Sequence, residues 1–587
     1  MNKKVTLSKE HIAAINRDRQ VIDNFDCLDA FFRMESVDIN LVRKLLFELI
    51  DDPQTRLDSI WWNLGEGNTA IYPSKVIPTL ENEKPYDSWF REGIDILKVL
   101  IDETRKRGLE TFFSYRINGS DNDVADGEST KITKIPMKEA HPEWLIHTWK
   151  ENFNVQHTTK DMNGFWNFAF DGVRKHKLKI LQEVCENYDL DGIEIDFARV
   201  CPVLPPGHQW ENRDRLTEFM RSLRFTLLEI EKKRDKPLLI AARVPENLQG
   251  CHFDGIDVET WAQEELVDIF VMGVRSFDVD IHAFQRICSD TNIKLYPCID
   301  DNHATDGYQH PSIEVFRGVI ANWLHQGADG IETFNWAYTS KFFGPEYLGN
   351  PPLNELLSLK SNDGTDDNSI PMRPDENGQM VPNNQFIVHQ QVYRELNNLE
   401  EIHNNSKAFV VQRRGGGHGS SVAPNPEDWW TPRWMYMNTN MLALLPEKLA
   451  CDGKADTLLT MYIADKINNS TDSIKQITAR VLISDPMTDS LPKQDRLERV
   501  KIATMGHPNR ELYNLPPNQN IKNNIELRIN NSLLEKPLTD KGWLVYQVNE
   551  KQIATGENLI GLRMSNNTND NGKDLIIEKF EIHINYR

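Results

Sequence analysis

The sequence predicts an α/β fold, a (β/α)8 barrel of the TIM type, followed by a mainly antiparallel β-sandwich domain. Three observations support this prediction. Between about residues 20 and 340, eight short apolar segments alternate with segments of helical character. One of these segments carries two acids on one face of a predicted strand. Beyond about residue 405, short β-type segments are separated by Asn, Gly, Asp and Pro turns, without a strong helix among them.

The eight strands of the predicted barrel are spaced as βα units require. They begin near Val21, Leu57, Leu109, Leu190, Leu238, Asp268, Ile293 and Gly330. Amphipathic helices are expected between several of them, at residues 89–107, 216–233 and 315–326. Basic residues followed by Gly108 end the first of these helices, and Gly327 ends the last, because such pairs are helix stop signals. A doubly wound open sheet is the alternative, but no glycine-rich dinucleotide-binding loop supports it.

The fourth strand is the most informative segment, since it combines apolar and acidic residues in alternation. Ile193, Ile195 and Phe197 fall on one face, and Glu194 and Asp196 fall on the other. Two neighbouring carboxylates on a buried strand are costly unless they have a function. We therefore expect the apolar face to meet the surrounding helices and the acids to line the barrel interior, with the chemistry at the strand ends.

The remainder of the chain divides into a linker and the β-region. Residues 360–385 are polar and typical of a loop. The predicted strands of the β-region are 408–412, 457–463, 477–483, 525–529, 543–548, 559–564 and 576–586. The expected domains are a catalytic barrel at 15–345, a loop, linker and barrel-closing segment at 346–405, and a β-sandwich accessory domain at 406–587.

Composition excludes some classes of partner. Acidic residues outnumber basic ones by 88 to 67 and give a net charge of −21, which argues against nucleic acid or an anionic membrane as the main partner. The N-terminus lacks an apolar signal-peptide core and no segment is long enough to span a bilayer, so we expect a soluble protein of the cytoplasm or periplasm. Seven dispersed cysteines without a CxxC pair predict reduced thiols. No cofactor is expected, and the oligomeric state stays open.

Polar residues follow most of the predicted strands, where a barrel brings them to a common rim. Those expected to bind substrate are Asn63, Tyr115, Arg116, Asn118, Arg199, Arg243, Arg275, Asp300 and Trp336. Those expected to be catalytic are Glu194, Asp196, Glu332 and His303. A metal site formed by Asp300, Asp301 and His303 is a weaker option, because such a cluster has low specificity, and no metal is expected.

Four arginines, at 116, 199, 243 and 275, stand at four different strand ends. Arginine binds carboxylate, sulfate and phosphate through paired donors, so the four together predict an anionic substrate in a locally positive pocket. The competing interpretation is that the acids of the same rim neutralise the arginines. The acids themselves could provide the two carboxyl groups of glycoside hydrolysis, with Glu194 and Glu332 as a plausible pair, or could orient sugar hydroxyls and arginines.

Three segments resemble glycoside-hydrolase-like TIM barrels of polysaccharide-degrading bacteria. They are the fourth strand, the upstream Trp166-Asn167-Phe168-Ala169 with Val173-Arg174, and residues 327–336. The resemblance covers residues 15–340. The closing β-region is similar only in its general pattern of short strands and turns to the sandwich domain that such barrels often carry. It implies carbohydrate substrates and a site at the strand ends. The fourth strand departs from the Asn-Glu of common hydrolase barrels, which leaves the general acid unassigned.

Three functions follow from these observations. The first is a glycoside hydrolase that degrades acidic oligosaccharides, containing uronic acid or sulfate, with Glu194, Asp196 and Glu332 as the pool of acid, base and nucleophile. The second is a dehydratase or lyase that eliminates water or an alcohol from a terminal uronic acid, with His303, Tyr115 or Glu194 as acid and base. The third is a non-catalytic sugar-binding barrel, since a fold alone does not imply a reaction.

Overall fold

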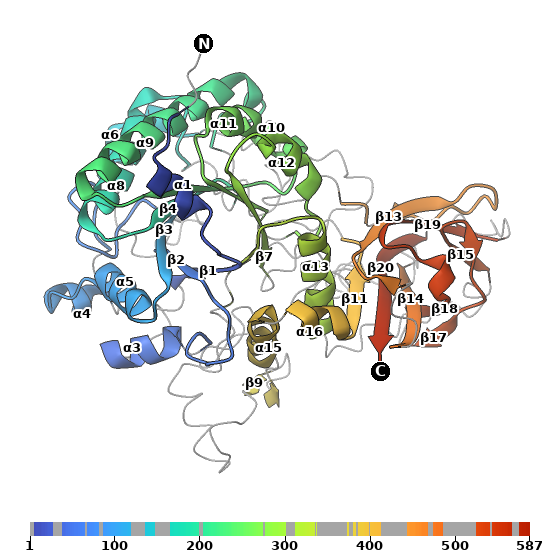
Figure 1. The fold of residues 1–587 in the computed structure, drawn as a ribbon. Helices are drawn as coiled ribbons and strands as arrows, with labels where there is room; N and C mark the ends of the chain where they lie inside the picture. The colour runs from blue at the N-terminus through green and yellow to red at the C-terminus, as the bar shows by residue number, and fades with distance from the viewer. Residues whose placement is uncertain are drawn as a thin grey trace.

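The computed structural model contains a closed barrel of eight parallel strands in sequence order (Figure 1). It describes residues 5–27, 38–47, 49–64, 67–80, 86–118, 135–146, 165–198, 203–273, 276–300, 311–334, 336, 372–374, 380–382, 385–397, 399–412, 443–445, 447–467, 473–484, 524–540, 543–565 and 575–587. The barrel strands are β1 (Val21–Asp26), β2 (Ser59–Asn63), β3 (Glu110–Arg116), β4 (Gly192–Asp196), β5 (Leu239–Val244), β6 (Ile269–Met272), β7 (Lys294–Asp300) and β8 (Ile331–Phe334). All eight predicted strands are confirmed, and β8 closes the ring by pairing with β1.

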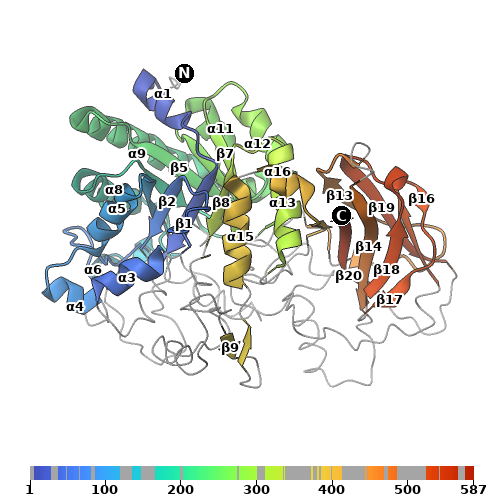
Figure 2. The ribbon, with the colours of Figure 1, turned by 60° about the horizontal axis from the view of Figure 1, so that its bottom comes forward.

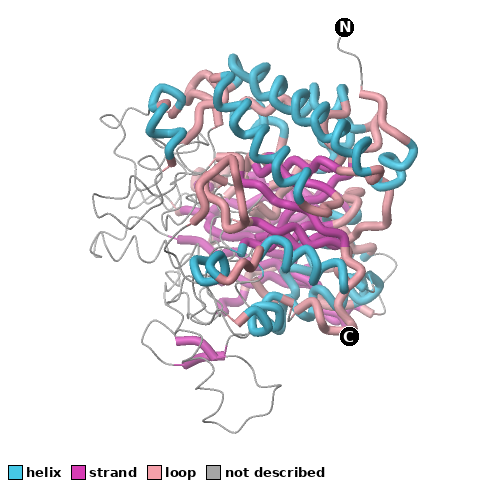
Figure 3. The backbone as a smooth tube through the Cα atoms, turned by 90° about the vertical axis from the view of Figure 1, so that its left-hand side faces the viewer, coloured by secondary structure: helices cyan, strands magenta, loops and turns pink. Residues whose placement is uncertain are grey.

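Helices surround these strands, and Figure 3 shows them on either side of the strand layer. They are α1 (Lys9–Ile15), α3 (Ile39–Leu46), α4 (Tyr86–Arg91), α5 (Ile96–Lys106), α6 (Pro136–Ala140), α8 (Asp171–Asn187), α9 (Arg213–Arg234), α10 (Leu248–Asp254), α11 (Val258–Glu264), α12 (Ile281–Cys288) and α13 (Ile313–His325). One prediction is wrong in detail. Residues 89–107 form two helices, because Gly93 adopts a φ of +72° between α4 and α5.

An apolar plug fills much of the barrel interior from its amino-terminal end. Trp61 and Phe112 stack with ring centroids 4.6 Å apart. Gly192 makes this possible, since a Cβ there would lie 2.5 Å from the Phe112 ring. The other members of this inner cluster are Ile15, Ile22, Ala198, Leu239, Ala241, Ile269, Val271, Tyr296, Cys298 and Phe334. The plug reaches the level of the polar inward-facing residues, because Cys298 pairs with Glu332 and Phe334 follows Glu332 toward the carboxyl end of β8.

Helix α1 covers the amino-terminal face of the barrel, where Ile15 joins the inner apolar cluster. It is held there by a buried ionic cluster. The His11 ring contacts Glu231 at 2.6 Å through Nδ1 and Asp268 at 3.0 Å through Nε2, and Arg224 donates to both oxygens of Asp268. Burial opposes the charge of His11, but the hydrogen bonds to Asp268 and Glu231 raise its pKa to about 9. This end of the barrel is thus closed by structural contacts.

The β-region consists of antiparallel sheets that share one apolar core (Figures 1 and 2). One sheet has the order β11 (Lys407–Val410), β20 (Ile576–Tyr586), β14 (Ile474–Ser484), β18 (Trp543–Val548) and β17 (Leu538–Asp540), with β12 (Glu447–Lys448) also paired to β20. The other has the order β13 (Thr457–Ile463), β19 (Gly556–Met564), β15 (Ile525–Ile529) and β16 (Ser532–Leu533). The predicted fold class, a TIM-type barrel followed by antiparallel sheets, is confirmed.

Helix α13 joins the barrel to the β-region. Its Gly318 packs so closely on β11 that an added Cβ would lie 2.2 Å from the carbonyl oxygen of Ala408. Its Asn322 donates to the carbonyl of Tyr462 and accepts from the amide of Ala464. The segment 346–405, expected as a linker, contains the helices α15 (Gln385–Asn397) and α16 (Leu399–Asn404) and the strands β9 (Met372–Pro374) and β10 (Met380–Pro382). Figure 2 shows α15 and α16 beside α13. The domain boundaries themselves stay a prediction.

Among the described residues, no disulfide is formed by Cys27, Cys185, Cys251, Cys288, Cys298 or Cys451. Within the described ranges, no helix combines the length and the apolar character that a membrane span needs.

Candidate active site in the barrel interior

Arg243 on β5 is the centre of a buried ionic cluster beside the apolar plug. Its Nε lies 3.1 Å from Oε1 of Glu194, its Nη2 contacts Oε1 of Glu332, and its Nη1 lies 3.7 Å from Oδ2 of Asp196. All four side chains are inaccessible to solvent or nearly so. Three acids predicted from the sequence as catalytic thus meet at one guanidinium that was predicted to bind substrate.

The strand register explains why these residues meet. Glu194 pairs with Ala241 on β5, and Asp196 pairs with Arg243, so both acids face the barrel axis beside the arginine. Glu332 faces inward from β8, on which Phe334 presents its ring 4.1 Å from the guanidinium carbon of Arg243. Asp196 ends β4, so it is the carboxylate nearer the mouth, and Glu194 lies one pleat deeper.

Glu194 is held by neutral hydrogen-bond donors as well as by Arg243. Asn24 donates to its Oε2 at 2.6 Å, and the Ser114 hydroxyl donates to the same oxygen at 2.5 Å. Asn63, predicted as a substrate-binding residue, donates to Ser114 at 3.3 Å and so supports this network. Asn24 and Ser114 were not among the predicted site residues, although Ser114 lies between the aromatic residues Phe113 and Tyr115 in β3, which was a usable signal.

The electrostatics of the cluster favour protonated carboxyl groups. Burial raises the pKa of Glu194, with a further rise from Asp196, while Arg243 opposes the shift. Burial raises the pKa of Glu332 well above its usual range, and Arg243 again opposes this. Burial also disfavours the charge on Arg243, but Glu194 and Glu332 raise its pKa well above the ordinary value. The cluster therefore holds a permanent cation beside carboxyl groups that keep their protons to unusually high pH.

The second described arginine of the mouth, Arg116, also has an acidic partner. Its Nη2 lies 2.5 Å from Oδ2 of Asp26, the last residue of β1, and both side chains are buried. Asp26 was missed by the sequence analysis. The prediction of a locally positive pocket is therefore not met by the described arginines, each of which contacts carboxylates. For Arg116 and Arg243, the competing interpretation of neutralisation by acids is the better one.

Tyr115 faces away from the barrel axis, and Asn118 follows the carboxyl end of β3. The Tyr115 hydroxyl donates to the carbonyl of Gly67 at 2.7 Å and contacts Nζ of the buried Lys177 at 2.9 Å. Asn118 exchanges hydrogen bonds with the backbone of Trp166 at 2.7 and 3.2 Å. These contacts fasten loops to the barrel wall. The structure therefore places the Tyr115 side chain in the packing outside the strands, and a role of Asn118 in substrate binding stays a prediction.

Of the other predicted site residues, Trp336 is packed outside the barrel interior, Asp300 ends a barrel strand, and the rest lie outside the described residues. Trp336 is fully buried and stacks on His389, with ring centroids 4.0 Å apart, in the layer between the barrel and α15. Asp300 is the last residue of β7. Outside the described residues lie Arg199, Arg275, Asp301 and His303. Among the residues that are described, no group of three His, Cys, Asp or Glu side chains is arranged to hold a metal ion.

The position of Arg243 restricts what the acids can do. Its Nη2 contacts Glu332 Oε1 and lies 3.4 Å from Glu194 Oε2, so the guanidinium stands between these two carboxyl groups. In a glycosidase the scissile bond must occupy that space between the reacting carboxyls. The predicted pair Glu194 and Glu332 therefore does not flank an open site in this arrangement. Asp196, at the strand end, is the member of the cluster best placed to meet a ligand from the mouth.

Comparison with known proteins supports the family resemblance seen in the sequence. Residues 35–221 match the model of a family described as Glycosyl hydrolase-like 10. An S-layer-related protein of Niallia circulans is 28% identical over 112 residues, which are 18% of this chain and 6% of that protein's length. The predicted likeness to a glycoside-hydrolase-like TIM barrel with a C-terminal β-region is confirmed.

Three solved structures align with this chain at low identity. The PgaB (BpsB) glycoside hydrolase domain from Bordetella bronchiseptica aligns at 9% identity over 54% of this chain and 93% of that chain, with a TM-score of 0.37. The maltogenic alpha-amylase AmyB from Thermotoga neapolitana aligns at 12% identity over 67% and 80%, with a TM-score of 0.34. Alpha-L-fucosidase isoenzyme 2 from Paenibacillus thiaminolyticus aligns at 12% identity over 67% and 51%, with a TM-score of 0.34.

Proposed function

We propose that the protein is a glycoside hydrolase that cleaves oligosaccharides at the carboxyl end of its barrel. The observation that carries this proposal is the convergence of Glu194, Asp196 and Glu332 on Arg243. Three buried carboxyl groups with one cation are expensive for the fold, and apolar residues of similar size would pack at lower cost. Such clusters with raised pKa values are typical of acid and base chemistry.

Within this cluster, Asp196 is proposed as the carboxylate that meets the sugar. It ends its strand, it faces the barrel axis, and its Oδ2 lies 3.7 Å from Nη1 of Arg243. A carboxyl group at the end of a barrel strand can serve as a nucleophile or a general base in glycoside hydrolysis. Glu194 and Glu332, which lie deeper, are proposed to fix the guanidinium and to hold protons. His303 stays a candidate for the second reacting group.

Hydrolysis is proposed over elimination because of the arginines. Elimination from a uronic acid requires that a substrate carboxylate be neutralised by available cations. Arg116 and Arg243 each contact protein carboxylates instead. The acidic character of the substrate therefore depends on Arg199 and Arg275, and a uronic-acid or sulfated oligosaccharide remains the proposed substrate class on that basis.

A panel of neutral, uronic-acid-containing and sulfated oligosaccharides tests the proposal. Products are followed by mass and by absorbance in the ultraviolet band of a conjugated double bond. Addition of water across a cleaved linkage is the expected result. Loss of water or alcohol with new absorbance would establish elimination in place of hydrolysis. No change with any glycan, under conditions in which the protein is folded, would contradict an enzymatic role.

The variant Asp196→Asn separates the site from the scaffold. It is expected to lower kcat at least ~100-fold, the usual loss when an acid or base group is removed. The matched control is Glu110→Gln, because Glu110 is also a buried barrel carboxylate paired with an arginine, Arg19, at 2.5 Å. Glu110 begins β3 and therefore lies at the amino-terminal end of the barrel, opposite to the end at which Asp196 lies. The control should keep kcat within about threefold of the wild type. Equal losses in both variants would point to general destabilisation.

A further inference from the structure

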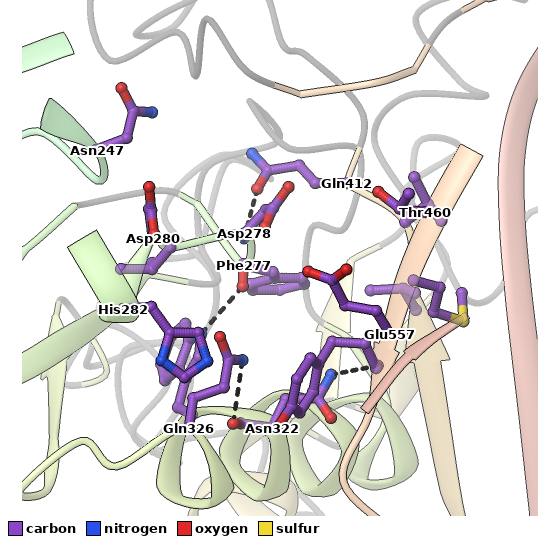
Figure 4. A pocket seen from close by; sticks show the side chains of 16 residues that line it. Asn247, Phe277, Asp278, Asp280, His282, Asn322, Gln326, Gln412, Thr460 and Glu557 are labelled. Atoms are coloured by element: carbon purple, nitrogen blue, oxygen red, sulfur yellow. Dashed lines mark hydrogen bonds between the residues drawn. The ribbon is translucent and has the colours of Figure 1, made fainter. Parts of the chain in front are cut away.

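A polar pocket lies outside the barrel, where the barrel meets the β-region. It has a volume of about 260 Å³ and is drawn in Figure 4. Its walls come from the segment between β6 and α12, from α13, and from β11, β13 and β19. None of the residues proposed above for catalysis lines it. It is therefore a separate cavity from the candidate active site.

The pocket presents acceptors on two opposite walls. Asp278 and Asp280 come from the barrel side, and Glu557 extends from β19 toward Phe277, as Figure 4 shows. All three acids are exposed at the pocket. The sixteen lining residues, all within the described ranges, include no lysine or arginine.

A fixed donor stands beside these acceptors. Gln412 is 3% exposed, and its Oε1 accepts from the Ser276 hydroxyl at 2.9 Å and from the Asp278 amide at 2.7 Å. These two bonds orient the amide group, so its Nε2 is turned away from them and toward the pocket that Gln412 lines (Figure 4). Among the described residues, no hydrogen-bond acceptor is paired with this Nε2. This N–H group can therefore donate to a ligand in the pocket.

From this lining we infer that the pocket binds a single sugar ring of an oligosaccharide. A sugar hydroxyl can donate to a carboxylate and accept from an amide at once, and neighbouring hydroxyls match acids and an amide set side by side. Phe277 and Met461 supply apolar surface for the ring carbons. The volume lies just below the ~300–1,000 Å³ of pockets for drug-sized ligands, which suits one ring.

The choice of a sugar as ligand rests on the proposed function, whereas the existence of the pocket does not. A second sugar site at the junction would let the β-region hold one part of a chain while the barrel acts on another. Linked sites raise the apparent affinity for a long substrate without changing the chemistry of cleavage. The pocket variants should therefore lower the affinity for long chains and leave kcat on short ones unchanged.

Binding of single sugars to the full chain tests the inference. Glucose, galactose, N-acetylglucosamine and glucuronic acid are titrated by calorimetry into the Asp196→Asn protein, with spermidine as a cationic probe. At least one neutral sugar is expected to bind, and Glu557→Gln or Asp278→Asn, each added to Asp196→Asn, should weaken that binding at least tenfold. Glu535→Gln is the matched control, because Glu535 is an exposed glutamate of the β-region that does not line the pocket.

The outcomes separate this inference from the proposed function. Sugar binding that is sensitive to Glu557→Gln, in a protein that cleaves no glycan, would support the pocket and contradict the hydrolase. Cleavage of oligosaccharides with unchanged sugar binding in both pocket variants would support the hydrolase and overturn the pocket inference. Binding of spermidine without any binding of neutral sugars would also overturn it, because the pocket would then be a cation site.

Discussion

Replacement of Arg243 by Gln should make the stability of the protein strongly dependent on pH. In the wild type, one guanidinium contacts Glu194, Asp196 and Glu332, and no side chain of the cluster is exposed. Glutamine removes the cation and leaves three buried carboxyl groups with only neutral donors, such as Ser114 on Glu194. The fold can reduce this cost only by binding protons, and those protons are available only at low pH.

The magnitude follows from the geometry. Removing one partner of a buried ion pair typically costs about 3–5 kcal/mol. Each additional proton that the folded variant binds, relative to the unfolded chain, lowers the free energy of unfolding by about 1.4 kcal/mol for every unit of rising pH. The pKa values of Glu194 and Glu332 are already raised in the wild type, so that protein also loses some stability as the pH rises. For one extra proton in the variant, the additional loss between pH 5 and pH 7 is about 2.7 kcal/mol.

Urea unfolding of both proteins at pH 5, 7 and 8.5 measures this difference. The matched control is Arg19→Gln, in which a buried arginine is removed from a single carboxylate, Glu110, while Arg17 remains 3.8 Å away. The control should show a weaker dependence on pH, since fewer carboxyl groups lose their cation. A flat profile for Arg243→Gln, or a slope no larger than that of the control, would refute the account of the cluster as an excess of buried acids.

Three further predictions concern the scaffold. His11→Gln should destabilise the fold most at pH 6–7 and little above pH 9.5, because carboxylates raise the pKa of His11 to about 9 against the opposing effect of burial. The stability that His11 contributes is complete below its unfolded pKa of about 6.5 and is lost as the pH rises through 9, so a difference in thermal midpoint that is constant with pH would contradict this. Gly192→Ala should cost about 1–3 kcal/mol in urea unfolding, because its Cβ would lie 2.5 Å from the Phe112 ring, and an unchanged urea midpoint would show that the plug can yield. Gly318→Ala should speed proteolysis between the barrel and the β-region, because its Cβ would lie 2.2 Å from the Ala408 carbonyl oxygen and would loosen the contact between α13 and β11. A digestion rate equal to that of the wild type would argue that α13 and β11 separate freely.

The strands could be predicted from sequence because their signal is local. Each barrel strand is a short apolar run between turn residues, and the start of each lies within a few residues of the prediction, as with Leu57 and the observed Ser59. The alternation around Glu194 also predicted correctly which face turns inward. Helix 89–107 was predicted as continuous because a glycine inside a helical pattern does not reveal its φ, and Gly93 is the residue at which the chain turns.

The partners of the site residues could not be predicted in the same way. Asp26 and Arg116 are 90 positions apart in the chain, and only the closed ring of strands brings them together. The anion-binding pocket was inferred from the arginines alone. The net charge around each arginine depends also on acids that other strands contribute. Tyr115 shows the opposite case, since the period of two places it on the face opposite Ser114 and Arg116, and that local rule was enough to exclude it from the interior.

A crystal structure of the Asp196→Asn variant with a bound oligosaccharide that the wild type degrades tests the central claim most directly. The account predicts a sugar at the carboxyl end of the barrel, with its reacting atoms within about 3.5 Å of the side chain at position 196. Arg243 should remain in contact with Glu194 and Glu332 beneath that sugar. A structure in which oligosaccharide occupies only the pocket at the junction with the β-region, or another surface, while the barrel interior stays closed, would contradict the assignment of the Arg243 cluster as the catalytic centre.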